Sequence, residues 1–100
     1  MNIRSEVRQL VDQGVLPNEK TPDLARLRLC ESLYRAIQRP LTDSEACALV
    51  QVLGDDGCFG LASSVIALIE TASGWPIEAC LAAAPQTELA NELRARAGRG

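Results

Sequence analysis

The centre of the chain, residues 41–74, reads LTDSEACALVQVLGDDGCFGLASSVIALIETASG. The run TDSE at residues 42–45 is a capping box, because its threonine can accept the amide proton of the glutamate while the glutamate reaches back to the threonine amide. Apolar residues then recur at helical spacing, and Gly54 predicts the end of this helix. The Asp-Asp pair at residues 55–56 can cap a second helix, expected from about residue 57 to residue 72. The stretch therefore predicts an antiparallel helical hairpin.

The second helix of this hairpin is apolar around most of its circumference. A helix of this kind normally lies at the centre of a bundle. Its apolar residues are Phe59, Leu61, Ala62, Val65, Ile66, Leu68 and Ile69. The remaining strip consists of small residues at i, i+4, i+7 and i+11, which are Gly60, Ser64, Ala67 and Thr71. Small residues let another helix approach closely, so this strip is either an internal helix contact or a partner surface.

Outside this hairpin, proline and glycine separate four more segments with helical periodicity. They are expected at about residues 2–13, 22–38, 76–83 and 86–97. Thr21 can cap the segment that begins at Pro22. No alternating strand pattern is present, so the prediction is an all-α, compact bundle of about six short helices, forming one domain over residues 1–100. A HEAT-like series of antiparallel pairs and a plain orthogonal bundle both fit the pattern.

The composition bears on chemistry and on the compartment of the protein. Histidine is absent, and the four cysteines include no Cys-x-x-Cys pair, so we expect no metal site, no cofactor and no enzyme activity. The cysteines are expected to be reduced and buried. No apolar run reaches about 18 residues and no signal segment precedes the first helix, so the expectation is a cytoplasmic protein without a membrane span.

Charge is distributed unevenly along the chain, whose net charge is −3. Residues 41–85 contain six acidic residues and no lysine or arginine. Nucleic-acid binding requires basic side chains to neutralise phosphates, so we expect none there. An acidic block favours a basic protein partner, although acidic residues also gather at helix N-termini for purely structural reasons. Both explanations stay open from the sequence.

Two individual residues have alternative interpretations. Cys58 lies near an expected helix N-terminus, which lowers a thiol pKa, but its acidic neighbours oppose that effect and disfavour a reactive thiol. Trp75 is the only tryptophan and lies in a predicted turn. It is either an anchor for a partner or a plug that closes one end of the core.

The stretch from Gly54 to Pro76, GDDGCFGLASSVIALIETASGWP, resembles a segment of small, helical, HEAT-like bacterial proteins. Some of these resemble immunity proteins of polymorphic or contact-dependent toxin systems, and the likeness covers roughly residues 41–76. It implies a non-enzymatic inhibitor that binds a cognate toxin domain, and many such toxins are basic. The candidate partner-binding residues are Asp43, Glu45, Asp55, Asp56, Glu70, Trp75 and Glu78. The alternative is a helical adaptor or regulatory subunit that forms a homodimer through the small-residue strip; the sequence leaves the oligomeric state open.

Overall fold

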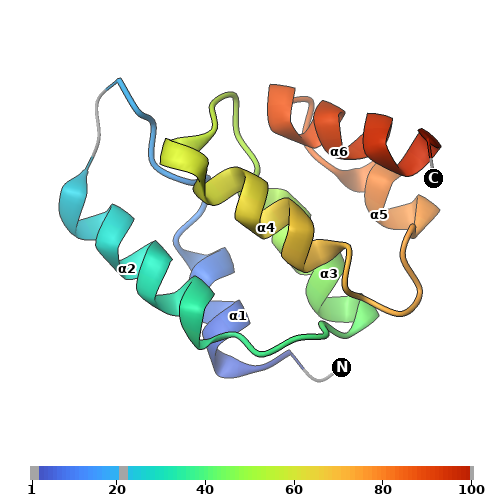
Figure 1. Cartoon of the computed structure of the whole chain (residues 1–100), viewed down its shortest axis with the longest axis horizontal. Helices are drawn as coiled ribbons and strands as arrows, with labels where there is room; N and C mark the ends of the chain where they lie inside the picture. Colours follow the sequence, from blue (N-terminus) through green and yellow to red (C-terminus); the bar gives the residue numbers. More distant parts are fainter. Residues whose placement is uncertain (1–2, 21–22, 100) are drawn as a thin grey trace.

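A computed structural model of the chain describes residues 3–20 and 23–99. Across these residues the fold is all-α, without strands, as predicted (Figure 1). The α-helices are α1 (Ser5–Asp12), α2 (Leu24–Ala36), α3 (Asp43–Leu49), α4 (Leu61–Ile69), α5 (Glu78–Ala83) and α6 (Glu88–Arg99). Two 3₁₀ turns, η1 (Val50–Val52) and η2 (Cys58–Gly60), flank the loop between α3 and α4. None of the helices in this described part is long and apolar enough to cross a membrane.

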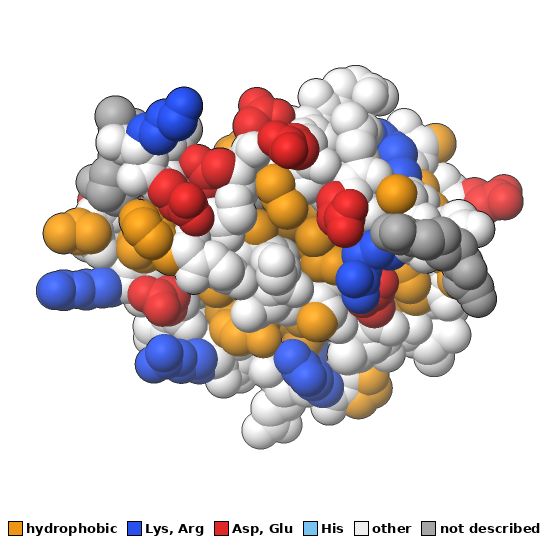
Figure 2. All heavy atoms as spheres, turned by 45° about the horizontal axis from the view of Figure 1, so that its top comes forward, with side chains coloured by type: hydrophobic (Ala, Val, Ile, Leu, Met, Phe, Trp, Pro, Cys, Tyr) orange, Lys and Arg blue, Asp and Glu red, His pale blue; other side chains and the backbone are white. Residues whose placement is uncertain are grey.

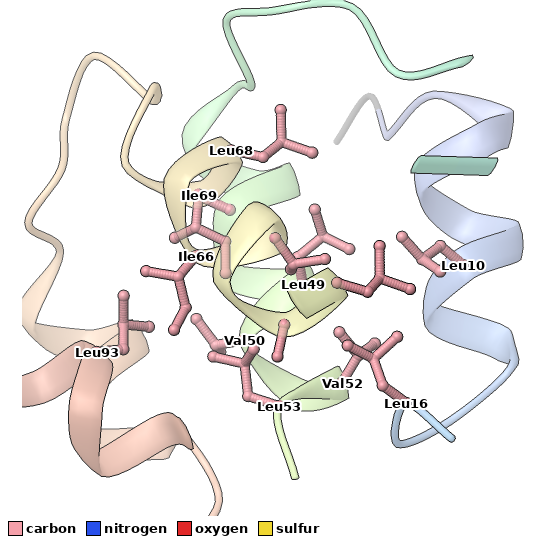
Figure 3. Packing of buried hydrophobic residues seen from close by; sticks show 14 of the residues in the cluster. Leu10, Leu16, Leu49, Val50, Val52, Leu53, Ile66, Leu68, Ile69 and Leu93 are labelled. Atoms are coloured by element: carbon pink, nitrogen blue, oxygen red, sulfur yellow. The ribbon is translucent and has the colours of Figure 1, made fainter. Parts of the chain in front are cut away.

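Helix α4 lies at the centre of the bundle, as its all-round apolar surface predicts. Helices α1 and α2 lie on one side of it, and α5 and α6 lie on the other (Figure 1). Side chains from both sides meet α3 and α4 in one core, in which Leu10 of α1, Leu49 of α3 and Leu93 of α6 are fully buried (Figure 3). Burial of aliphatic side chains supplies the main driving force for this arrangement.

The capping box at the start of α3 forms as predicted. The amide of Glu45 donates to Oγ1 of Thr42 over 3.1 Å, and the amide of Thr42 donates to Oε1 of Glu45 over 2.9 Å. The helix is shorter than its apolar pattern suggested, because it tightens into η1 after Leu49. The last turn of this segment then receives a hydrogen bond from the amide of Leu16 to the carbonyl of Val52, which ties the chain after α1 to it.

The helix expected from about residue 57 is interrupted near its start. Phe59 has φ +54° and Gly60 has φ +89°, and both values lie in the left-handed region. Helix α4 therefore begins only at Leu61, with Gly60 at its N-cap instead of an aspartate. As a result, Phe59 does not join the core as predicted but is 59% exposed.

Helix α2 begins with Asp23 as its N-cap. Oδ1 of Asp23 accepts the amide proton of Arg26 over 3.1 Å, which satisfies one of the free amides of the first turn. The predicted cap at Thr21 and the helix start at Pro22 lie outside the described residues.

The expectation that all four cysteines are reduced is wrong for two of them. Cys47 of α3 and Cys80 of α5 form a disulfide, with their Cα atoms 5.0 Å apart. This separation lies within the range that a disulfide spans. The pairing arises from the packing of two helices whose cysteines are 33 residues apart, so no local spacing could reveal it. Cys30 and Cys58 are free and buried, as expected.

Candidate protein-binding surface

Four acidic residues from three separate segments lie together at one end of the bundle. We call this group, Glu19, Asp55, Asp56 and Glu88, the acidic edge. The amide of Glu19 donates to Oδ2 of Asp56 over 3.0 Å, and the amide of Glu88 donates to Oδ1 of Asp55 over 3.0 Å. These bonds join the loop before α2 and the start of α6 to the loop between α3 and α4. Figure 2 shows acidic side chains gathered over this part of the surface.

A hollow of about 220 Å³ opens within the acidic edge. Its residues are Val15, Leu16, Asn18, Gly54, Asp55, Asp56 and Thr87. Val15 is 48% exposed and gives the hollow an apolar wall beside the two aspartates. Val15 also explains the glycine at position 54, because a Cβ there would lie 2.6 Å from Cγ1 of Val15. The hollow thus combines an apolar wall with negative charge.

The two aspartates of the hollow have different roles. Asp56 uses both carboxylate oxygens within the chain, since Oδ2 accepts the amide proton of Glu19 and Oδ1 accepts that of Cys58 over 2.9 Å. Asp55 accepts a hydrogen bond from Glu88 through Oδ1 only, and its Oδ2 accepts none from the described residues. Asp56 therefore organises the loop, whereas Asp55 retains an oxygen for a ligand.

Phe59 lies next to the acidic edge and is exposed because of the kink before α4. Its amide donates to Oε2 of Glu19, so the backbone that displays the ring is held by a member of the edge. An exposed aromatic ring beside charged groups is typical of the residues that dominate protein interfaces. The edge and the ring together form one candidate surface.

The other predicted site residues lie elsewhere. Asp43 is at the start of α3 and accepts the amide proton of Gly74 through Oδ1 over 2.9 Å, which places it beside the loop that carries Trp75. Trp75 is half-buried against the core, in agreement with a plug. Glu70 pairs with Arg96 at 2.6 Å, and Glu78 is exposed in the first turn of α5. The predicted residues thus do not form one patch. In an antiparallel hairpin, the acidic residues at the start of α3 and those in the loop after it lie at opposite ends.

Glu45 is removed from the surface altogether. Its side chain is 0% exposed, and its Oε2 accepts hydrogen bonds from the amide of Arg4 over 3.0 Å and from Nε of Arg4 over 2.9 Å. The hydrogen-bonded Arg4 guanidinium lowers the pKa of Glu45 to about 2 against the opposing effect of burial. Glu45 is therefore a structural anion and cannot contact a partner in this fold.

The Cys58 thiol is not activated. Burial raises its pKa to about 11, and the negative charge of Asp56 adds to this increase. A thiol with a raised pKa carries little thiolate near neutral pH and reacts slowly. The interpretation of Cys58 as an inert core residue is the one that its surroundings support.

Sequence reasoning identified half of the acidic edge, Asp55 and Asp56, and missed Glu19 and Glu88. Those two residues join the edge only through tertiary hydrogen bonds across more than 30 positions of sequence. Their local sequence shows a loop acid and a helix N-terminal acid, neither of which suggests a common surface. Val15 lies beyond the end of α1 at Asp12 and therefore lines the hollow.

Within residues 3–20 and 23–99, no group of three or more His, Cys, Asp or Glu side chains is arranged to hold a metal ion. The acidic edge is suited to bind a positively charged group. Comparison of the chain with protein-family models, with curated proteins and with solved structures finds no significant match.

Proposed function

We propose that this chain is a non-enzymatic protein that binds a basic protein partner through the acidic edge. The observation that carries the proposal is the hollow in which Asp55 keeps a free carboxylate oxygen beside the apolar wall of Val15. A lysine or arginine side chain matches this combination, because its methylene stem packs on apolar surface while its charged head meets a carboxylate. Exposed Phe59 supplies the apolar anchor next to it.

We further propose that the partner is a toxin domain and that the chain is its cytoplasmic immunity protein. Two features support this: the resemblance of residues 54–76 to a segment of small, helical, HEAT-like bacterial proteins, some of which resemble immunity proteins, and the acidic edge. A negative surface accelerates association with a basic toxin, which suits an inhibitor that must bind before the toxin acts.

The test uses the product of the gene next to the one that encodes this chain. We expect a toxin C-terminal domain there that co-purifies with this chain and whose growth arrest this chain relieves. Affinity should fall as salt concentration rises, because exposed charges at the interface are screened. Failure of the wild-type chain to bind or to protect contradicts the immunity function.

A charge-neutral variant tests the acidic edge itself. Asp55→Asn keeps an oxygen that can accept the Glu88 amide proton but removes the charge, and it should weaken binding by about tenfold, chiefly through slower association. The matched control is Glu6→Gln, in the first turn of α1 and outside the acidic edge. If both variants lose the same affinity for the partner, or if neither loses any, the interface lies outside the acidic edge even though the partner binds.

A further inference from the structure

We propose that the groove between α2 and the start of α4 is a self-association surface, in which two copies of this chain pair with their α2 helices antiparallel across a two-fold axis. This inference concerns the chain alone and does not depend on the identity of any toxin. It rests on three observations: a groove lined by both apolar and polar side chains, an exposed ring on its rim, and two opposite charges that have no ion pair or hydrogen bond with the described residues.

The groove has a volume of about 360 Å³ and lies between α2 on one side and η2 with the start of α4 on the other. One wall belongs to α2 and consists of Leu27, Glu31, Tyr34 and Arg35. The other wall belongs to η2 and α4 and consists of Phe59, Gly60, Leu61 and Ser64. Cys58 also borders the space.

Phe59 gives the groove a protruding side chain as well as a hollow. The left-handed backbone at this residue turns the ring outward, and 59% of the residue is exposed. The ring lies at the same groove as the apolar side chains of Leu27 and Leu61, and apolar side chains grouped on a surface mark contact sites. Because knob and groove belong to the same face, a two-fold axis can place the ring of each copy in the groove of the other.

The charges on the α2 wall favour a second copy of this chain as the molecule that occupies the groove. Glu31 and Arg35 are four residues apart on the groove side of α2, and neither side chain has an ion pair or hydrogen bond with any described residue. In an antiparallel pair of α2 helices with the axis between these two positions, Glu31 of each copy faces Arg35 of the other. The face is thus complementary to itself, which is the requirement for a two-fold interface.

Phe59 belongs to both proposed surfaces. A bound partner and a second copy would therefore exclude each other at this ring. The two proposals are tested separately, because self-association is measured with the purified chain and partner binding with the toxin domain.

The first experiment measures the mass of the purified chain by sedimentation equilibrium from micromolar to millimolar concentration. We expect a reversible monomer–dimer equilibrium in the wild type. Phe59→Ser should raise the dimer dissociation constant by about tenfold or more, since the ring is lost twice in a symmetric interface. The matched control is Leu29→Ser, which removes another exposed apolar side chain from α2, 43% exposed and outside the groove, and should leave the constant unchanged.

Charge reversal with rescue tests the orientation of the two copies. Glu31→Arg places like charges opposite each other and should raise the dissociation constant by about tenfold or more. The double variant Glu31→Arg/Arg35→Glu exchanges the two charges and should restore the wild-type value to within about threefold. Asp12→Arg makes the same charge change on α1, outside the groove lining, and serves as the control. Circular dichroism of each variant verifies that the fold is retained.

Two outcomes overturn the inference. A wild-type chain that stays monomeric up to millimolar concentration has no such interface. A dimer that is indifferent to both Phe59→Ser and Glu31→Arg, or one that the charge exchange fails to restore, uses a different surface or a different orientation.

Discussion

Glu45 joins the segment before α1 to the start of α3 through one buried carboxylate. It closes the capping box of α3 with Thr42, and it accepts hydrogen bonds from the amide and the guanidinium of Arg4 just before α1. The Arg4 guanidinium also donates to the carbonyl of Pro40, over 3.3 Å. A buried charge is tolerated when its hydrogen-bonding capacity is filled in this way, and removing one partner is costly.

Replacement of this carboxylate should destabilise the fold. Glu45→Gln is expected to lower the free energy of unfolding by about 2 to 3 kcal/mol at neutral pH, because one amide cannot serve all the donors that the carboxylate satisfies. Urea denaturation measures the effect. Glu92→Gln, an exposed glutamate of α6, is the control and should change the value by less than about 0.5 kcal/mol.

The same ion pair should give the chain a specific acid sensitivity. The folded-state pKa of Glu45 is lowered to about 2 from an ordinary value of 4.5, so its contribution to stability is complete above pH 4.5 and is lost as the pH falls toward 2. The stability difference between wild type and Glu45→Gln should therefore narrow over this interval. A difference that stays constant from pH 6 to pH 2.5 would show that the charge of Glu45 is not what stabilises the fold.

The kink before α4 changes which side chains the start of this helix exposes. Three consecutive residues, Cys58, Phe59 and Gly60, have positive φ, so α4 starts later than its apolar pattern indicates and Phe59 turns outward. A non-glycine residue in the left-handed region costs about 1 kcal/mol or more, and the carboxylates of Glu19 and Asp56, which bind the amides of Phe59 and Cys58, offset this cost.

Replacement of glycine by alanine should have different effects on stability at Gly60 and at Gly98. Gly60→Ala is expected to destabilise the chain by about 1 kcal/mol, because alanine disfavours φ +89° although open space surrounds the position. Gly98→Ala, in α6 and also without a close neighbour, should be neutral or stabilise by up to about 0.5 kcal/mol through helix propensity. Thermal unfolding of both variants checks the signs, and equal shifts would argue against the kink.

The disulfide between Cys47 and Cys80 connects α3 of the central hairpin to α5 of the C-terminal pair. Under denaturing conditions without reductant, thiol titration should detect two thiols, those of Cys30 and Cys58, and four after reduction. Reduction should lower the free energy of unfolding by about 3 to 4 kcal/mol, the value expected for a closed loop of this length. A count of four thiols in a chain that has never been reduced contradicts the pairing.

The sequence is informative about the helices and much less so about their contacts. Helix type, number and the capping box at Thr42 follow from local periodicity and local hydrogen bonds, and the structure agrees. The disulfide, the Arg4–Glu45 pair and the joining of Glu19 to Asp56 depend on helices that meet only after folding. Phe59 was misplaced because its apolar character fits a helix core, whereas the adjoining glycines allow the backbone to leave the helix.

The disulfide also makes the chain between Cys47 and Cys80 a covalent ring that contains all of α4. A protease that cuts anywhere within this ring, for example in the exposed turn at Gly74, cannot release a fragment while the bond is intact. The nicked protein should migrate as one band on a non-reducing gel and as two bands after reduction. Limited proteolysis of a cell extract would thus show directly whether the disulfide is formed in the cell.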